Sequence, residues 1–101
     1  MMSFEEVVKA LEEGRVRVAE KTADGWKVNA WVKEAILEGF RKGKLVDMSK
    51  EEYSFFDKDT LPLRKFSLED KVRIVPGGSS ARCGAFLDPS VIMMPPAYVN
   101  I

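Results

Sequence analysis

Residues 81–99 read ARCGAFLDPSVIMMPPAYV and repeat with a period of six. Small or aliphatic side chains recur at every sixth position, and a second row follows four residues after the first. The first row is Ala81, Leu87, Met93 and Val99, and the second row is Ala85, Val91 and Ala97. Turn-forming Gly, Asp and Pro residues separate the repeats. Neither an α-helix nor a flat strand has a period of six, whereas each side of a left-handed parallel β-helix does.

In such a β-helix every hexad forms one short side of a triangular coil, with the larger aliphatic side chain inside it. We therefore predict that residues 72–101 form the first, incomplete coil of a left-handed parallel β-helix. The alternative is an irregular, proline-rich tail, and the hexads alone do not decide between the two structures. Repeat folds bury a continuous core only by stacking several units. We therefore expect this coil to be truncated and the natural chain to continue past Ile101.

Residues 1–71 carry the patterns of a small α+β domain. Ser3 and Glu6 have the spacing of a capping box, in which each side chain accepts the other residue's backbone N–H. Apolar residues at helical spacing follow, and Gly14 stands where a helix ends. The pattern predicts a short helix over residues 4–13.

A β-hairpin is predicted next. Residues 15–21 alternate charged and apolar side chains, with Val16 and Val18 on one face, which is typical of a half-buried strand. Residues 23–25, Ala-Asp-Gly, form a turn signal, and residues 26–28 can return as the partner strand.

A second helix follows, with Asn29 as its predicted cap. Its apolar face consists of Val32, Ile36 and Phe40, with Trp31 and Ala35 on an adjoining line. The cations and the glycine of residues 41–44 match the helix dipole and the helix stop. Residues 44–71 predict loops and short strands, and residues 72–75 alternate like a strand that ends at Pro76.

Composition excludes several classes of function. The chain has 101 residues, a net charge of zero from 16 basic and 16 acidic side chains, and no histidine. A zero net charge gives no long-range field for nucleic acid or an anionic membrane surface. The absence of histidine removes Ser-His and Cys-His nucleophile pairs, His-ligated zinc and histidine acid–base chemistry. We therefore expect no metal, and no nucleic-acid or membrane partner.

The sequence predicts a cytoplasmic protein. Cys83 is the single cysteine and cannot form an internal disulfide, which fits a reducing compartment. The first residues lack the basic and then apolar pattern of a signal peptide. No run approaches the roughly 18 apolar residues that a membrane-spanning helix needs.

Several segments resemble the tetrahydrodipicolinate N-succinyltransferase family. The resemblance runs in register from about Leu11 to Ile101 and is strongest where the family's β-helix begins. The segments that carry it are residues 17–21, 25–26, 31–33, 40–41, 56–58, 73–76, 84–86 and 94–101. Each segment would be weak alone, but together they are specific.

The resemblance implies a transferase of the diaminopimelate route to lysine. Such enzymes move a succinyl group from succinyl-CoA, their co-substrate, to the amino group of an acceptor derived from tetrahydrodipicolinate. The resemblance also implies cytoplasmic homotrimers, with active sites between neighbouring β-helices. The family's arginine that meets an acceptor carboxylate falls on Arg73, and a guanidinium suits this role because it forms a forked, charge-assisted pair. The catalytic acidic residue and the coenzyme-binding coils are expected beyond Ile101, so we expect the 101 residues alone to be inactive.

Other candidate residues have simpler structural explanations. Cys83 lies in a predicted turn, and no base is visible that would activate it as a nucleophile. Trp26 and Trp31 are predicted to be core or interface aromatics rather than a stacking platform. Asp57 and Asp59 are predicted to lie in a charged, solvated loop rather than to form an acid–base pair.

Two further segments suggest phosphate binding only weakly. The cations of residues 41–44 could touch a CoA phosphate, but cations at the end of a helix need no ligand to explain them. Residues 77–78, Gly-Gly, lack the surrounding spacing of a P-loop or dinucleotide site, so a turn into the coil suffices.

Two alternative functions fit the sequence. The chain could be a non-catalytic binding or assembly module, which weak acceptor binding without CoA turnover would favour. It could also belong to a hexapeptide acyltransferase with another acyl-CoA donor, which activity of a complete homologue with acetyl-CoA would favour. A β-helix carbonic anhydrase is disfavoured, because this segment offers no histidine to zinc.

Overall fold

The structure is a computed structural model that describes residues 2–101. Two α-helices, one short 3-10 helix and eight short strands form the regular structure of these residues. In chain order they are α1 (Phe4–Glu12), β1 (Ala19–Thr22), β2 (Gly25–Val28), α2 (Ala30–Lys42), β3 (Leu45–Asp47), β4 (Phe56–Lys58), η1 (Leu68–Asp70), β5 (Arg73–Ile74), β6 (Ser80–Ala81), β7 (Ile92–Met93) and β8 (Tyr98–Val99). This mixture of helices and small sheets confirms the predicted α+β class.

Helix α1 begins with the predicted capping box. The Ser3 hydroxyl accepts from the Glu6 backbone N–H at 3.2 Å, and the Glu6 carboxylate accepts from the Ser3 backbone N–H at 2.9 Å. These hydrogen bonds lower the pKa of the Glu6 carboxyl from its ordinary value. After the helix, Gly14 adopts a φ of 76°, a left-handed conformation that glycine enters without steric cost. The predicted helix over residues 4–13 is therefore confirmed to within one residue.

The two helices pack together through a small hydrophobic cluster. Val7 and Leu11 of α1 and Val32 of α2 are its buried members. Partly buried side chains around it are Met2, Val16, Val18, Ala35, Ile36 and Ile101. Gly39 is buried where α2 crosses α1, and a Cβ at this position would overlap the Phe4 ring. A glycine in mid-helix thus sets how closely the two helices approach.

Strands β1 and β2 form the predicted hairpin, but pairing begins later than the sequence indicates. The predicted strand over residues 15–21 is wrong in its extent, because β1 starts at Ala19 and its four residues are all exposed. Val16 and Val18 do point inward, since they pack against the helix cluster as part of the connection. Period-2 alternation therefore identified the inward side chains but not the start of strand pairing.

Asn29 stands at the start of α2 but does not cap it with its side chain. Its Nδ2 donates to the Arg17 carbonyl at 2.9 Å, and its backbone N–H donates to the Val18 carbonyl at 2.7 Å. Instead of capping α2 with its side chain, Asn29 therefore joins the two ends of the hairpin through two hydrogen bonds.

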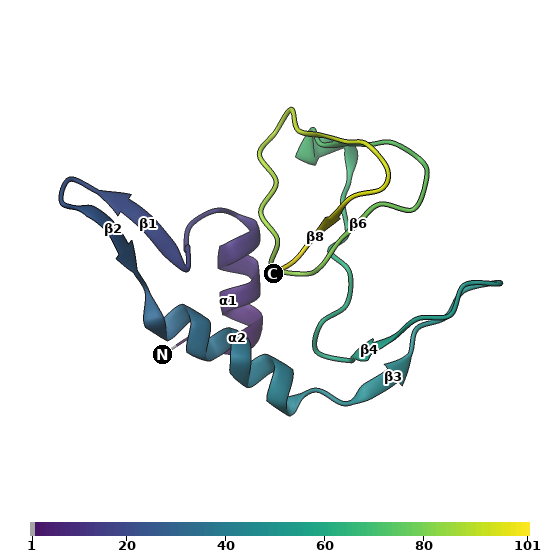
Figure 1. Ribbon diagram of the computed structural model, residues 1–101, viewed down its shortest axis with the longest axis horizontal. Coiled ribbons are helices and arrows are strands. Elements are labelled where there is room, and N and C mark those ends of the chain that lie inside the picture. The colour runs from purple at the N-terminus through teal and green to yellow at the C-terminus, as the bar shows by residue number, and fades with distance from the viewer. Residues whose placement is uncertain (1) are drawn as a thin grey trace.

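A second antiparallel hairpin lies where loops and short strands were predicted. β3 and β4 pair Leu45 with Lys58 and Asp47 with Phe56. The connection between them is exposed, and Tyr53 stacks on Phe55 with ring centroids 6.3 Å apart. The hairpin projects away from the rest of the molecule (Figure 1).

The last part of the chain, residues 72–101, forms parallel strand pairs at the spacing of three hexads, and we refer to it as the coil. β6 pairs with β8, which joins Ala81 to Val99 of the same hexad row. β5 pairs with β7, which joins Ile74 to Met93. The distance along the chain between these two residues is one position longer than three hexads. The predicted strand over residues 72–75 is confirmed in type, although β5 is only two residues long.

The hexad rows lie inside this coil, as predicted. Ala81, Leu87 and Met93 of the first row and Ala85 of the second are buried. Partly buried residues packed against them are Phe66, Val72, Ile74, Val91, Ala97 and Val99. Both rows face a common interior, and two parallel strand pairs join successive parts of the segment, which favours a coil over an irregular tail.

The coil docks against the first part of the chain at residues 83–86. The Glu12 carboxylate at the end of α1 accepts from the Gly84 backbone N–H at 2.8 Å. The Arg17 guanidinium stacks 4.1 Å from the centre of the Phe86 ring. The Arg64 guanidinium donates to the Ala85 carbonyl at 2.8 Å. The boundary between residues 71 and 72 stays a prediction, although residues 62–66 already pair and pack with the coil.

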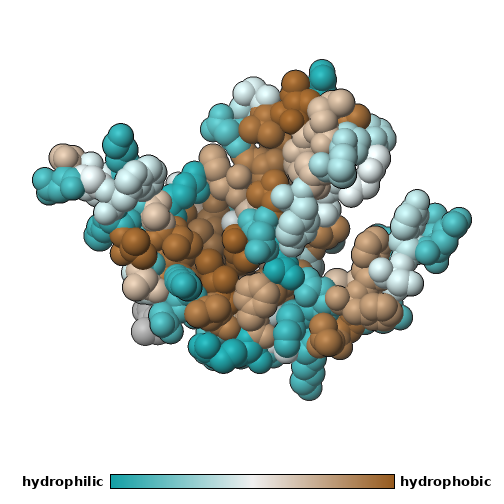
Figure 2. Space-filling view, viewed as in Figure 1, coloured by the Kyte–Doolittle hydropathy of each residue, from teal (hydrophilic) through white to brown (hydrophobic). Residues whose placement is uncertain are grey.

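The molecule is elongated, measuring 49 × 33 × 21 Å along its principal axes. Figure 1 shows both hairpins projecting in opposite directions from the helices and the coil. Hydrophobic residues gather over the centre of this face, whereas the far ends of the two hairpins are hydrophilic (Figure 2). The described core is small and divided between the coil and the helix pair.

We predict that Gly39→Ala destabilises the protein by about 1–2 kcal/mol, because a Cβ overlaps the Phe4 ring and over-packing outweighs the helix propensity that alanine gains. Chemical denaturation monitored by circular dichroism measures the change.

The control is the same substitution in a Phe4→Ala background. There the clash is absent, and Gly39→Ala should stabilise α2 by up to about 1 kcal/mol from propensity alone. An unchanged sign in both backgrounds would contradict the assigned contact.

Candidate functional site

Arg73 lies on the outer side of the coil. Its backbone N–H donates to the Val91 carbonyl at 2.9 Å, and it pairs in register with Ile92. Its neighbours Val72 and Ile74 pack toward the interior, so the strand alternation turns Arg73 to solvent. Among residues 2–101 its guanidinium has neither an ion-pair partner nor a hydrogen bond. Its charge is therefore available to an anionic ligand.

Arg82 occupies the centre of a polar cluster that sequence reasoning missed. Its guanidinium forms an ion pair with Asp57 of β4 at 2.6 Å and donates to the Asn100 side chain at 3.0 Å. It also lies 5.0 Å from the centre of the Phe40 ring of α2. The arginine side chain is 13% exposed, and its Nε has no hydrogen-bond partner among the described residues. No local pattern marks this residue, because all of these partners are distant from it in the sequence.

The predicted solvated loop around Asp57 is wrong in part. Asp57 is partly buried on β4, and the adjacent Arg82 guanidinium lowers the pKa of its carboxyl from the ordinary value. Asp59 makes a separate interaction, in which its carboxylate accepts from the Lys44 backbone N–H at 3.0 Å. The two aspartates have different partners, so the structure gives no support to an acid–base pair.

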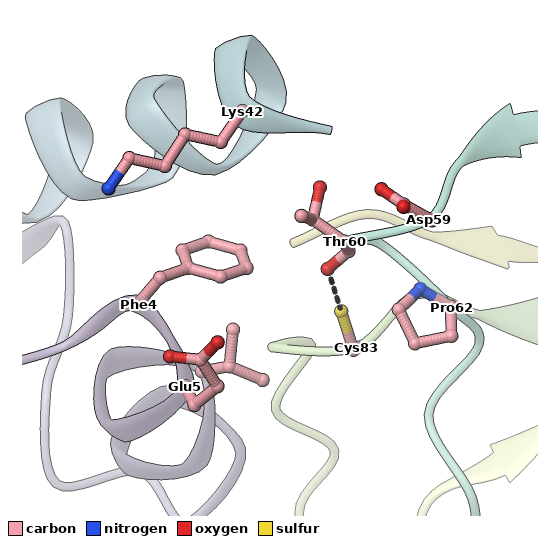
Figure 3. A pocket seen from close by; sticks show the side chains of 8 residues that line it. Phe4, Glu5, Lys42, Asp59, Thr60, Pro62 and Cys83 are labelled. Atoms are coloured by element: carbon pink, nitrogen blue, oxygen red, sulfur yellow. Dashed lines mark hydrogen bonds between the residues drawn. The ribbon is translucent and has the colours of Figure 1, made fainter. Parts of the chain in front are cut away.

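A shallow cavity of about 450 Å³ lies between α1, the end of α2 and the segment that contains Cys83 (Figure 3). Its lining residues are Phe4, Glu5, Val8, Lys42, Asp59, Thr60, Pro62 and Cys83. The Cys83 thiol points at the Thr60 carbonyl, with Sγ and oxygen 3.8 Å apart (Figure 3). Burial raises the pKa of the thiol to about 11, so it is protonated at neutral pH. This agrees with an inert rather than a nucleophilic cysteine.

The cations predicted at the end of α2 pair with an acid of the same helix. Arg41 contacts the Glu38 carboxylate at 2.7 Å, and Lys42 approaches it to 3.8 Å. The Arg41 guanidinium lowers the pKa of the Glu38 carboxyl. These exposed pairs account for the cations without a phosphate ligand.

The structure also places the glycines of residues 77–78 and the two tryptophans. Gly77 adopts a φ of 146° and lies against Pro95, whose Cγ would be 2.6 Å from an added Cβ. This supports a turn rather than a phosphate cradle. Trp26 and Trp31 are 72% and 51% exposed, so the expectation that they are core aromatics is wrong. An interface role for them is left open.

Residues 2–101 contain no group of three or more His, Cys, Asp and Glu side chains placed to hold a metal ion. Within the same residues, neither helix has the length and hydrophobicity to cross a membrane.

We predict a coupling energy of about 1–2 kcal/mol between Asp57 and Arg82 at neutral pH, since the pair is short and partly buried. A double-mutant cycle with Asp57→Asn and Arg82→Met measures it by chemical denaturation. Because the folded pKa of Asp57 is lowered, this stabilisation is complete above the unfolded pKa of about 3.9 and is lost as pH falls through the folded value.

The matched control is the exposed pair of Glu13 and Arg15, whose nitrogen and oxygen are 2.7 Å apart. Its cycle should give about 0–0.5 kcal/mol, because solvent screens exposed pairs. Equal coupling energies for the two pairs, or an Asp57–Arg82 coupling that does not change down to a pH of about 2, would contradict the structural role given to Arg82.

The first part of the chain is similar to a known protein family. Residues 2–41 match the family described as tetrahydrodipicolinate N-succinyltransferase N-terminal. These residues comprise α1, the β1–β2 hairpin and nearly all of α2. The match therefore covers the helix pair and its hairpin but stops before the coil.

Curated relatives extend the similarity over nearly the whole chain. Three of them are named 2,3,4,5-tetrahydropyridine-2,6-dicarboxylate N-succinyltransferase. The protein of Bordetella petrii is 41% identical over 98% of this chain and 37% of its own length. The protein of Nitrosococcus oceani is 43% identical over 91% of this chain and 35% of its own length. The protein of Haemophilus influenzae is 34% identical over 98% of this chain and 37% of its own length. This chain thus spans little more than a third of the length of these relatives, and over nearly its whole length it is similar to their N-terminal portion.

Proposed function

We propose that this chain is the N-terminal part of an acyltransferase that succinylates the amino group of a tetrahydrodipicolinate-derived acceptor, with succinyl-CoA as donor. The observation that carries the proposal is similarity to enzymes of that name over 91% to 98% of the chain. The reaction belongs to the diaminopimelate route to lysine. The single cysteine, which leaves no internal disulfide, agrees with a cytoplasmic enzyme.

We further propose that residues 72–101 are the first coil of a left-handed parallel β-helix. The parallel pairing of β6 with β8 and of β5 with β7 supports this, because three hexads close one triangular coil. The buried row of Ala81, Leu87 and Met93 supports it as well, since an inward residue is required once per side. Further coils stacked on this one would hold the coenzyme and the catalytic acidic residue.

Arg73 is the proposed anchor for a carboxylate of the acceptor. Its guanidinium is exposed on a rigid paired strand, and it makes no ion pair among the described residues. A fixed guanidinium binds a carboxylate through two parallel charge-assisted hydrogen bonds. Its place on the outer side of the coil also suits an active site between neighbouring β-helices of a homotrimer, which is the assembly that we propose.

The chemistry would be direct transfer, in which the acceptor amine attacks the thioester carbonyl of succinyl-CoA. The carbon–nitrogen bond forms as the carbon–sulfur bond breaks, CoA leaves as the thiolate, and a carboxylate accepts the proton of the amine. No group among residues 2–101 is assigned to that proton transfer. We therefore expect the 101 residues alone to show no turnover, and Arg73 to act in binding.

The proposal predicts that Arg73→Ala, in the enzyme that carries this chain as its N-terminal portion, raises the acceptor KM by roughly ten- to a hundredfold. The basis is loss of a charge-assisted hydrogen-bonded pair worth about 1.5–3 kcal/mol. The KM for succinyl-CoA should stay unchanged. Steady-state release of CoA with each substrate varied in turn measures both constants.

Two controls separate this role from a general effect. Arg73→Lys keeps the charge but not the forked geometry, so it should recover only part of the acceptor affinity. Arg15→Ala removes another exposed arginine and should leave both KM values unchanged. An acceptor KM that is the same in Arg73→Ala and the parent would remove Arg73 from the site. An enzyme active only with acetyl-CoA would instead favour a different acyl donor.

A further inference from the structure

The outer face of the β5–β7 pair places Arg73 beside apolar side chains. Arg73 pairs in register with Ile92, so their side chains lie next to each other on one face of the two strands. Two residues further along, alternation turns Val75 and Met94 to the same face. Ile92 is 51% exposed and Met94 63%, whereas Val75 is half-buried. We call the surface formed by Ile92, Met94 and Val75 the apolar strip, and the Arg73 guanidinium lies at its edge.

The apolar strip does not fill the core of the coil. The side chains that pack into the interior from these strands are those that alternate with the strip, namely Val72, Ile74, Val91 and Met93. The strip therefore lies outside the hydrophobic cluster, and the packing of the coil gives no reason for its apolar character.

The outer face of the other strand pair carries polar groups instead. β6 pairs Ser80 with Tyr98, which leaves a hydroxyl on each outward side chain. The next outward residues on the two segments, Arg82 and Asn100, share a hydrogen bond of 3.0 Å. Outward positions of the coil thus accept polar side chains, so the apolar residues beside Arg73 are a local feature of that side.

We propose that the apolar strip binds the saturated carbons of the acceptor whose carboxylate Arg73 anchors, an inference that rests on the function proposed above. The relatives are named for a 2,3,4,5-tetrahydropyridine-2,6-dicarboxylate, in which three methylene carbons separate the two carbons that bear carboxylates. A largely apolar surface with one fixed polar group matches such a molecule, because the charged group sets the orientation and the apolar contact adds affinity.

The strip acts in specificity rather than as a second anchor. Arg73 alone binds any small carboxylate, because its forked hydrogen bonds involve only the carboxylate oxygens. Ile92 is its direct neighbour and contacts the carbons next to the bound carboxylate, and Met94 contacts those further along. The site therefore distinguishes carboxylates by the length of the apolar chain that covers the strip.

Inhibition by straight-chain monocarboxylates tests this contact in the enzyme that carries this chain as its N-terminal portion. Acetate, butyrate and hexanoate each offer one carboxylate to Arg73, with a progressively longer chain. As competitive inhibitors against the acceptor, they should bind roughly two- to fourfold more tightly for each added methylene group, which is the gain from half to full burial of that group.

The variant that carries Ile92→Thr and Met94→Gln makes the strip polar, with little change in side-chain size and with β-branching kept at residue 92. It should reduce the gain per methylene group to less than about 1.5-fold and raise the acceptor KM on the order of fivefold. The KM for succinyl-CoA should stay unchanged. The matched control is Leu45→Thr, because Leu45 is a 70% exposed aliphatic residue of β3, and it should change none of these values.

Arg73→Ala separates failure of this inference from failure of the proposed role of Arg73. It should weaken the binding of every monocarboxylate. An Arg73→Ala enzyme that binds acetate and the acceptor as the parent does would remove Arg73 from the site, and the inference with it. If Arg73→Ala weakens binding but the chain-length gain survives in the Ile92→Thr, Met94→Gln variant, the inference alone is overturned. It is also overturned if that variant changes only in its sedimentation, because the strip then contacts another copy of the chain.

Discussion

The side chain of Arg82 joins three parts of this molecule that are distant from one another in the sequence. It reaches Asp57 on the second hairpin, the Phe40 ring on α2 and Asn100 beside β8. The described core is small and divided, and among its members only Ile101 of the coil packs against the helix cluster. Directional polar contacts, and the hydrogen bond from Gly84 to Glu12, therefore fix the position of the coil. A half-buried arginine tolerates this role only because its charge is paired.

Local patterns predicted local structure well. The capping box at Ser3, the turn of the first hairpin and the inward hexad row each involve residues whose relative positions are set by a few backbone dihedrals. Strand limits were harder, since β1 begins at Ala19 although the alternation starts at residue 15. Alternation reports which side faces the core, whereas pairing depends on where a partner strand lies.

The long-range contacts of the candidate site could not be read from the sequence. Asp57 looked like one member of a charged loop, because nothing in its surroundings specifies an arginine 25 residues later. Trp26 and Trp31 were predicted to be core or interface aromatics, because tryptophan is highly buried on average. Their exposure depends on how the first hairpin projects from the helices, which is a tertiary property. Residue type thus predicted the kind of interaction but not its partner.

The position of Arg73 follows from the packing of its neighbours. Val72 and Ile74 contribute to the interior of the coil, and the pleat of the strand then turns the residue between them to solvent. An outward position on a paired strand is rigid, yet its side chain is not needed for folding. The residue type at this position can therefore be set by ligand binding with little effect on the free energy of unfolding. The same coil packing that buries the hexad row thus presents a fixed guanidinium on the outside, where a ligand or a neighbouring copy can meet it.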